Sequence, residues 1–291
     1  MKTRITIGSL MILVLAGMFW MDRYWGGYFI CLVAMAITAA ALHELFLMAA
    51  KNGAQPFRLT GIGFGAALLP YYVWSDVLNK PLGAQAFVAF IMAPLLGLIL
   101  ALMGRAITRP EGLGPQVRNI AITVFGVLYV ALPMAFLVRT RFLTDEGWYL
   151  VMLVLAVTKA SDTGAYFAGV ALGRRKLAPR ISPNKTVEGA LGGLVASALA
   201  SLGMSYGLGI RTLIDLGPIA TTSFGLVVGA GSQVGDLTES LIKRSANTKD
   251  SGDMLPAFGG VLDLIDSFLV AAPVAYFLLA IFAKITRLGN T

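Results

Sequence analysis

The sequence of 291 residues has one cysteine, Cys31, and one histidine, His43. A single cysteine excludes an intrachain disulfide and a cysteine metal cluster. A single histidine excludes a multi-histidine metal site. Any metal ion must therefore be held by oxygen ligands, which favours Mg²⁺ or a similar hard cation.

Charged residues are also scarce. They make up 13% of the chain against 57% for hydrophobic residues, whereas about a quarter of a soluble domain is charged. Water cannot solvate this much apolar surface, so lipid must surround most of the chain. The net charge of +8 would suggest nucleic acid as the partner of a soluble protein. Here cytoplasmic loops rich in Lys and Arg explain it, and no nucleic-acid partner is expected.

Long apolar runs are plentiful. A spanning helix needs about 20 largely apolar residues, and nine segments meet that length. They lie near 5–21, 26–50, 60–78, 84–104, 119–138, 148–170, 187–209, 217–238 and 260–284. The first segment lacks a small-x-small cleavage site, so we interpret it as a span. The pattern predicts an all-α polytopic integral membrane protein with about nine transmembrane helices.

Basic residues are unequally divided between the two sides that these spans define. Fifteen fall on the side of the loop that contains Arg174, Arg175 and Lys185, and seven fall on the other side. The bias places this loop and the N-terminus in the cytoplasm and the C-terminus outside. Glycine-rich stretches at 189–193 and 225–235 predict close helix packing.

Ionisable residues within spans divide the chain in two. Residues 1–150 form N-terminal transmembrane helices with few internal charges, and residues 151–291 contain most of the ionisable groups in or beside spans. Such residues are costly in a membrane and are functional candidates. His43 and Glu44 are an exception in the first half, and Glu44 is either a distant member of the site or a satisfied helix–helix contact.

Two sets of polar residues each share one helical face. Lys159, Asp162 and Tyr166 follow i, i+3, i+7 spacing, although an internal Lys–Asp pair that neutralises itself explains them equally well. Asp236, Glu239, Ser240 and Lys243 form the second set. A solvated helix end explains Lys243 but not Asp236, which follows a long Gly/Val/Ala stretch.

Two acids, Asp263 and Asp266, stand at i, i+3 just inside the last span. Carboxylates on one face repel each other, and a divalent cation would relieve that repulsion. The alternative is a frayed helix start with acids at its positive end.

The basic loop continues into Ser182, Lys185 and Thr186, which are groups suited to phosphate. On composition alone an ordinary basic cytoplasmic loop explains it as well. Carboxylates for metal, basic groups for phosphate and a membrane setting together favour phosphoryl or nucleotidyl transfer to a lipid.

The order of the motifs resembles the phosphatidate cytidylyltransferase (CDP-diacylglycerol synthase) family. The signature-like part at 236–267 contains Ser240-Leu241-Ile242-Lys243-Arg244, Lys249-Asp250-Ser251-Gly252, Leu255-Pro256, Gly259-Gly260, Asp263 and Asp266. Gly235-Asp236-Leu237 and Glu239 precede this run, as in that family. Upstream, Asp162, Ala165-Tyr166-Phe167, Ile181-Ser182-Pro183, Lys185-Thr186 and Glu188-Gly189 are similar too. The likeness covers roughly 158–268. Phe258 and Leu264 stand where the family commonly has His and Arg, so neither of those groups can act there.

The resemblance implies transfer of a cytidylyl group from CTP to phosphatidate in a bacterial cytoplasmic (inner) membrane, with the active site facing the cytoplasm. It implies Mg²⁺, with a second metal ion as an open alternative, and a homodimer. The implied catalytic residues are Asp236, Ser240, Lys243, Arg244, Lys249, Asp250 and Asp263. The implied metal ligands are Asp236 and Asp263, assisted by Asp250 or Asp266. The implied substrate-binding residues are Asp162, Tyr166, Ser182, Lys185, Thr186 and Glu188.

Three other functions remain open on the sequence. A secondary transporter or channel would use the buried acids for cation or proton coupling and would need a pathway to both membrane faces. A CTP-dependent enzyme could act on another membrane lipid. A catalytically inactive scaffold is permitted by Phe258 and Leu264 but disfavoured by the intact carboxylates.

Overall fold

The computed structural model describes residues 17–77, 84–108, 114–207, 217–252 and 259–289. Residues 17–25 are helical. The helices that follow are α2 (Tyr28–Lys51), α3 (Arg58–Val77), α4 (Ala84–Ile107), α5 (Gln116–Gly126), the π-helical turn η1 (Val127–Ala131), α6 (Leu132–Arg141), α7 (Trp148–Leu172), α8 (Val187–Gly207), α9 (Pro218–Ser245), α10 (Val261–Ile265) and α11 (Phe268–Gly289). Two short strands, β1 (Lys176–Ala178) and β2 (Ser182–Thr186), lie between α7 and α8.

The helices coincide closely with the apolar segments of the sequence. Within the described ranges, five helical segments are long and apolar enough to cross a membrane: Tyr28–Lys51, Gln116–Arg141, Trp148–Leu172, Val187–Gly207 and Val261–Ala283. The chain is therefore an integral membrane protein, and the prediction of an all-α membrane architecture is confirmed. The predicted first span at 5–21 lies mostly outside the described residues, and the number of nine spans stays a prediction.

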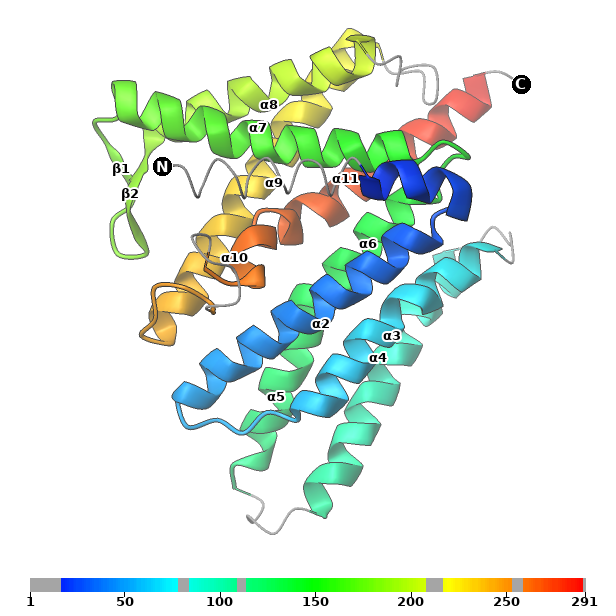
Figure 1. Ribbon diagram of the computed structural model, residues 1–291, viewed down its shortest axis with the longest axis vertical. Helices are drawn as coiled ribbons and strands as arrows, with labels where there is room; N and C mark the ends of the chain where they lie inside the picture. Colours follow the sequence, from blue (N-terminus) through cyan, green and yellow to red (C-terminus); the bar gives the residue numbers. More distant parts are fainter. Residues whose placement is uncertain (1–16, 78–83, 109–113, 208–216, 253–258, 290–291) are drawn as a thin grey trace.

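Small residues hold α7, α8 and α9 close together. A Cβ added at Gly164 of α7 would collide with the Cβ of Ala196 on α8, and one at Gly192 of α8 would collide with Ala168 on α7. On α9, a Cβ at Gly225 would lie 2.7 Å from the carbonyl oxygen of Ser197. Figure 1 shows α7 and α8 side by side along their length. The packing predicted from the glycine-rich stretches is thus confirmed.

The first half of the chain packs around buried apolar side chains of α2 and α3. Leu42 and Phe46 of α2 and Leu69 of α3 are fully buried. At one end of this bundle the Arg141 guanidinium at the end of α6 pairs with the buried carboxylate of Asp22. The pair joins the helical stretch at 17–25 to the end of α6.

The C-terminal helices complete the molecule around α9. Helix α11 packs against α9 and α6, while the short α10 contacts α2 (Figure 1). The signature-like part of the sequence therefore runs from α9 through the loop at 246–252 to α10, next to a helix from the N-terminal half.

Candidate active site

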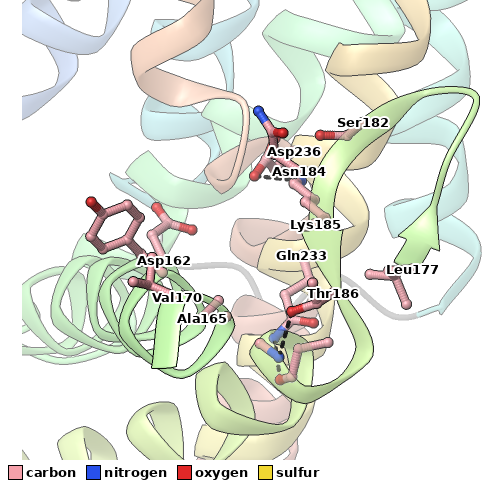
Figure 2. Close-up of a pocket in the computed structure, with 14 residues that line it drawn as sticks. Asp162, Ala165, Val170, Leu177, Ser182, Asn184, Lys185, Thr186, Gln233 and Asp236 are labelled. Atoms are coloured by element: carbon pink, nitrogen blue, oxygen red, sulfur yellow. Dashed lines mark hydrogen bonds and ion pairs between the residues drawn. The ribbon is translucent and has the colours of Figure 1, made fainter. Parts of the chain in front are cut away.

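A cavity of about 540 Å³ lies between α7, α8, α9 and the strands. Six of the predicted site residues line it: Asp162, Tyr166, Ser182, Lys185, Thr186 and Asp236. Figure 2 shows Lys185 of β2 pointing toward Asp236 of α9, with Asp162 of α7 on the opposite wall. The cavity thus collects acidic and basic side chains from segments that are far apart in the sequence.

The wall formed by β1 and β2 is an antiparallel hairpin. Lys176 pairs with Thr186 and Ala178 with Ser182. Thr186 ends the hairpin and accepts the backbone N–H of Gly189 at 3.1 Å in the first turn of α8. The hairpin is therefore fixed at the point where it enters a helix, and the fixed end carries Lys185 and Thr186.

The Glu188 carboxylate anchors the other side of the hairpin. Its Oε2 accepts the backbone N–H of Arg174 at 3.0 Å and that of Arg175 at 3.1 Å, and its Oε1 lies 3.1 Å from Nε of Arg175. In the structure Glu188 holds the chain that enters β1, and its role in substrate binding stays a prediction.

Asp236 and Lys185 form an ion pair with 2.6 Å between Oδ2 and Nζ. Both side chains remain about a third or a quarter exposed, at 33% and 26%. The pair is therefore reachable from the cavity.

Asp162 is held by neighbours from α7, from α9 and from the turn between α10 and α11. The Lys159 ammonium lies 3.3 Å from its Oδ2, and the hydroxyls of Ser232 and Ser267 lie 3.4 Å and 3.2 Å from its Oδ1. The Ser267 hydroxyl also lies 3.1 Å from Oδ1 of Asp266. A single hydroxyl thus links the cavity carboxylate to the buried Asp266 behind it.

A second polar group surrounds Lys243 of α9. Its ammonium lies 2.6 Å from Oδ1 of Asp263 and 2.6 Å from Oε2 of Glu239. Glu239 is fully buried, and its Oε1 has no hydrogen-bond partner among the described residues. Asp236, Glu239 and Lys243 lie on one face of α9, as predicted, and α9 connects this group to the cavity.

The loop after α9 closes on the same aspartate. Oδ2 of Asp263 accepts the backbone N–H of Ser251 at 2.9 Å and that of Gly260 at 2.8 Å, and the Ser251 hydroxyl lies 2.7 Å away. A Cβ at Gly259 would lie 2.8 Å from Oδ2 of Asp263 and 3.5 Å from Cβ of Asp250, so Asp250 is a close neighbour of Asp263.

The other predicted residues lie at the edge of these groups. Arg244 is exposed and donates weakly to the carbonyls of Ile181 and Thr248, at 3.4 Å and 3.3 Å. Lys249 is exposed in the loop, and Ser240 is half-buried on α9. The carbonyl of Leu264 lies 3.5 Å from Nζ of Lys159, and Phe258 lies outside the described residues.

Comparison with known families covers nearly all of this sequence. Residues 2–282 match the family described as the Cytidylyltransferase family. The chain belongs to this family.

The chain is also similar to individual proteins. It is 38% identical over 166 residues to a phosphatidate cytidylyltransferase of Bacillus subtilis (strain 168), which is 57% of this chain and 60% of that protein. It is 32% identical over 260 residues to a phosphatidate cytidylyltransferase of Staphylococcus aureus (strain COL), which is 87% and 91% of the two chains. An uncharacterised protein of Escherichia coli (strain K12) is 35% identical over 211 residues, 70% of this chain and 68% of that protein.

Some residues of this candidate site were not singled out from the sequence. Asn184 and Gln233 line the cavity, and Nε2 of Gln233 donates to the carbonyl of Ala190 at 2.9 Å. Gln233 stands three residues before Asp236, so the face of α9 could have revealed it. Ser251 lies within the motif but was given no role, because its contact with Asp263 depends on how the loop folds back.

The carboxylate oxygens of this candidate site suit Mg²⁺ better than a softer metal. The described part of the chain has no group of three or more acidic, His or Cys side chains arranged to hold a metal ion. Mg²⁺ commonly binds one or two carboxylates together with substrate phosphates, rather than a complete protein cage. Asp236 on the cavity wall and the neighbouring pair Asp250 and Asp263 have the chemistry for such partial sites.

Proposed function

We propose that this chain transfers the cytidylyl group of CTP to phosphatidate, giving CDP-diacylglycerol and pyrophosphate. The family and the named relatives support the reaction, and relatives at 32% identity cover most of the chain. The cavity in which Lys185 and Asp236 face Asp162 is the observation that supports this location for the reaction. A phosphate oxygen of the lipid attacks the α-phosphorus of CTP, and the bond to the β-phosphate breaks.

Basic side chains at the cavity and beside it are proposed to hold the phosphates. Lys185, with the hydroxyls of Ser182 and Thr186, would bind one phosphate at the cavity mouth. Lys243, Arg244 and Lys249 would neutralise the triphosphate and the leaving pyrophosphate, and Ser240 would hydrogen-bond a phosphate oxygen. Phosphatidate is already an oxyanion, so the reaction needs no strong general base.

Mg²⁺ is proposed at two positions, consistent with the donor sets described above. Asp236, with Asp266 behind it, would hold one ion, and Asp263 with Asp250 would hold a second. Bound Mg²⁺ would supply charge neutralisation at the phosphates and alignment for in-line attack. In the structure each of these two positions contains an ion pair with a lysine, so Lys185 and Lys243 are the groups that would turn toward substrate phosphate.

The lipid tails are proposed to enter from the side of α7. Tyr166, Phe167 and Val170 are 67%, 65% and 74% exposed, and Tyr166 and Val170 line the cavity together with Leu177 of β1. Exposed apolar side chains next to a polar cavity suit a substrate with a charged head and acyl chains. CTP would arrive from the opposite, aqueous side.

The placement in the cell follows from the same proposal. We infer nine spans in a bacterial inner membrane, with the hairpin and the loop at 246–252 facing the cytoplasm, on the strength of the positive-inside bias. We infer a homodimer, for which the exposed stripe of Leu191, Val195 and Leu199 on α8 is the candidate contact. Residues 151–291 are the proposed catalytic region.

The deciding experiment is CTP-dependent conversion of phosphatidate by the purified protein in detergent, with and without Mg²⁺. The Asp236→Asn and Asp263→Asn variants are measured beside the wild type, and gel filtration checks that each is folded. We expect Mg²⁺-dependent CDP-diacylglycerol formation that falls at least a hundredfold in both variants.

No turnover by folded protein with Mg²⁺ would contradict phosphatidate as the acceptor. Other membrane lipids would then be offered with CTP, and finally ion flux would be measured in vesicles. Turnover that is unchanged in both variants would contradict the proposed metal positions but leave the reaction standing.

A further inference from the structure

One carboxylate from the N-terminal half contacts the loop at 246–252 and the start of α10. Glu44 lies on α2 and is 2% exposed. Its Oε1 accepts the backbone N–H of Val261 and its Oε2 accepts that of Leu262, both at 2.9 Å. Its Oε2 also lies 3.0 Å from the hydroxyl of Ser251. The sequence left open whether this acid serves the site or only joins helices.

These contacts complete the first turn of α10. The residue before this turn is Gly260, which has no side chain to accept the free backbone N–H groups that begin a helix. Asp263 accepts the N–H of Gly260, and Glu44 accepts the next two. A residue from α2 therefore accepts the N–H groups that a local capping side chain would otherwise accept.

Ser251 connects Glu44 to the group around Lys243. Its hydroxyl is within hydrogen-bond distance of Glu44 and of Oδ2 of Asp263. The other oxygen of Asp263 receives the Lys243 ammonium at 2.6 Å. The Ser251 hydroxyl thus connects Glu44 to Asp263, the carboxylate that pairs with Lys243.

Two glycines let the loop approach this closely. A Cβ at Gly252 would lie 2.7 Å from Oε1 of Glu44, and a Cβ at Gly260 would collide with Oε2 of Glu44 and with Oγ of Ser251. At these two positions the packing leaves no space for a side chain between α2 and the backbone that faces it.

We propose that Glu44 is a positioning residue of the reaction, which fixes Asp263 and Lys243 through α10 and Ser251 without touching substrate. The proposal rests on the role given above to Lys243 and Asp263. It adds a residue outside residues 151–291 to the machinery, so the predicted catalytic region depends on the N-terminal half for its geometry.

The test compares Glu44→Gln with Thr38→Val in the full-length protein. Gln keeps the size of Glu but places an amide NH₂ against a backbone N–H donor. Thr38 is a matched control, since it is fully buried on the same helix and its hydroxyl has no hydrogen-bond partner among the described residues. Turnover is measured per folded molecule, taken from the monodisperse gel-filtration peak, with KM determined for both substrates.

We expect kcat of Glu44→Gln to fall at least tenfold, with KM for phosphatidate within about twofold of wild type, and Thr38→Val to match wild type. A Glu44→Gln protein that melts earlier but turns over normally per folded molecule would overturn the proposal, because it would show a role in stability alone. A wild type without turnover would instead refute the proposed function.

A double variant tests the path through Ser251. If Glu44 acts through this hydroxyl, Glu44→Gln combined with Ser251→Ala should be no more than about threefold slower than the worse single variant. Losses that multiply in full would show that the two residues act independently and would overturn the proposed path.

Discussion

Lys185 of β2 lies 2.6 Å from Asp236 of α9, and both line the cavity between α7, α8, α9 and the strands. The pair joins the hairpin to the helix that carries the signature-like residues. Because both side chains are partly exposed, the ion pair is weak, and we expect a phosphate or a cation to compete with it.

Removal of the Lys185 ammonium should therefore affect substrate binding more than folding. We expect Lys185→Ala to raise KM for CTP or for phosphatidate at least tenfold, with little change in melting temperature. Lys176→Ala is the matched control, because Lys176 is an exposed lysine on the neighbouring strand. Equal effects of the two substitutions would indicate general loss of positive charge instead of a specific phosphate contact.

The hairpin should loosen when Glu188 loses its charge. Glu188→Gln weakens the hydrogen bonds to the backbone of Arg174 and Arg175, so we expect faster trypsin cleavage between residues 174 and 185 and a threefold to tenfold loss of turnover. Glu146→Gln, at an exposed acid before α7, is the control. An unchanged cleavage rate would contradict the anchoring role.

The close contact of α7 and α8 should not tolerate a larger side chain. Gly192→Leu places atoms where Ala168 already lies, and overpacking of this kind costs about 1–3 kcal/mol. Gly203→Leu on the same helix is the control, since nothing lies within 4 Å of a Cβ there. Thermal unfolding in detergent should show a clear drop for the first substitution only.

The buried pair of Asp22 and Arg141 should matter to stability and not to chemistry. Asp22→Asn leaves an uncompensated guanidinium, and breaking a buried pair from one side costs about 3–5 kcal/mol. We expect a large fall in the unfolding temperature with normal turnover per folded molecule. The double variant Asp22→Asn, Arg141→Met should recover part of the loss, and a double variant worse than the single one would contradict this account.

Helical periodicity explains how much the sequence could predict. Long apolar runs gave the positions of α2 to α11 closely, because a helix satisfies its own backbone and needs no distant partner. The same periodicity correctly put Asp236, Glu239 and Lys243 on one face of α9. The division of a continuous span into α5, η1 and α6 was not predicted, since an apolar run carries no signal for a π-helical turn.

Contacts between distant segments were beyond the sequence. Asp236 and Asp263 were predicted as the main metal ligands, but nothing in the pattern indicated that Lys185 and Lys243 would pair with them. Glu188 is predicted to bind substrate because it belongs to the motif, and no feature of the pattern indicated that its oxygens would also accept the backbone N–H groups before β1. The sequence did not indicate the partners of Glu44, because a lone carboxylate in an apolar helix is compatible with many different partners.

The contact between Glu44 and Ser251 has a consequence for the synthesis of the protein. The two residues are 207 positions apart, and translation adds about 5–20 residues per second. During synthesis α2 must therefore remain in the membrane for roughly 10–40 seconds with an acid that has not yet met its partners. The insertion machinery has to tolerate an unpaired Glu44 during that interval. If the ribosome stalls within it, the loop at 246–252 that contains Ser251 has not yet been synthesised.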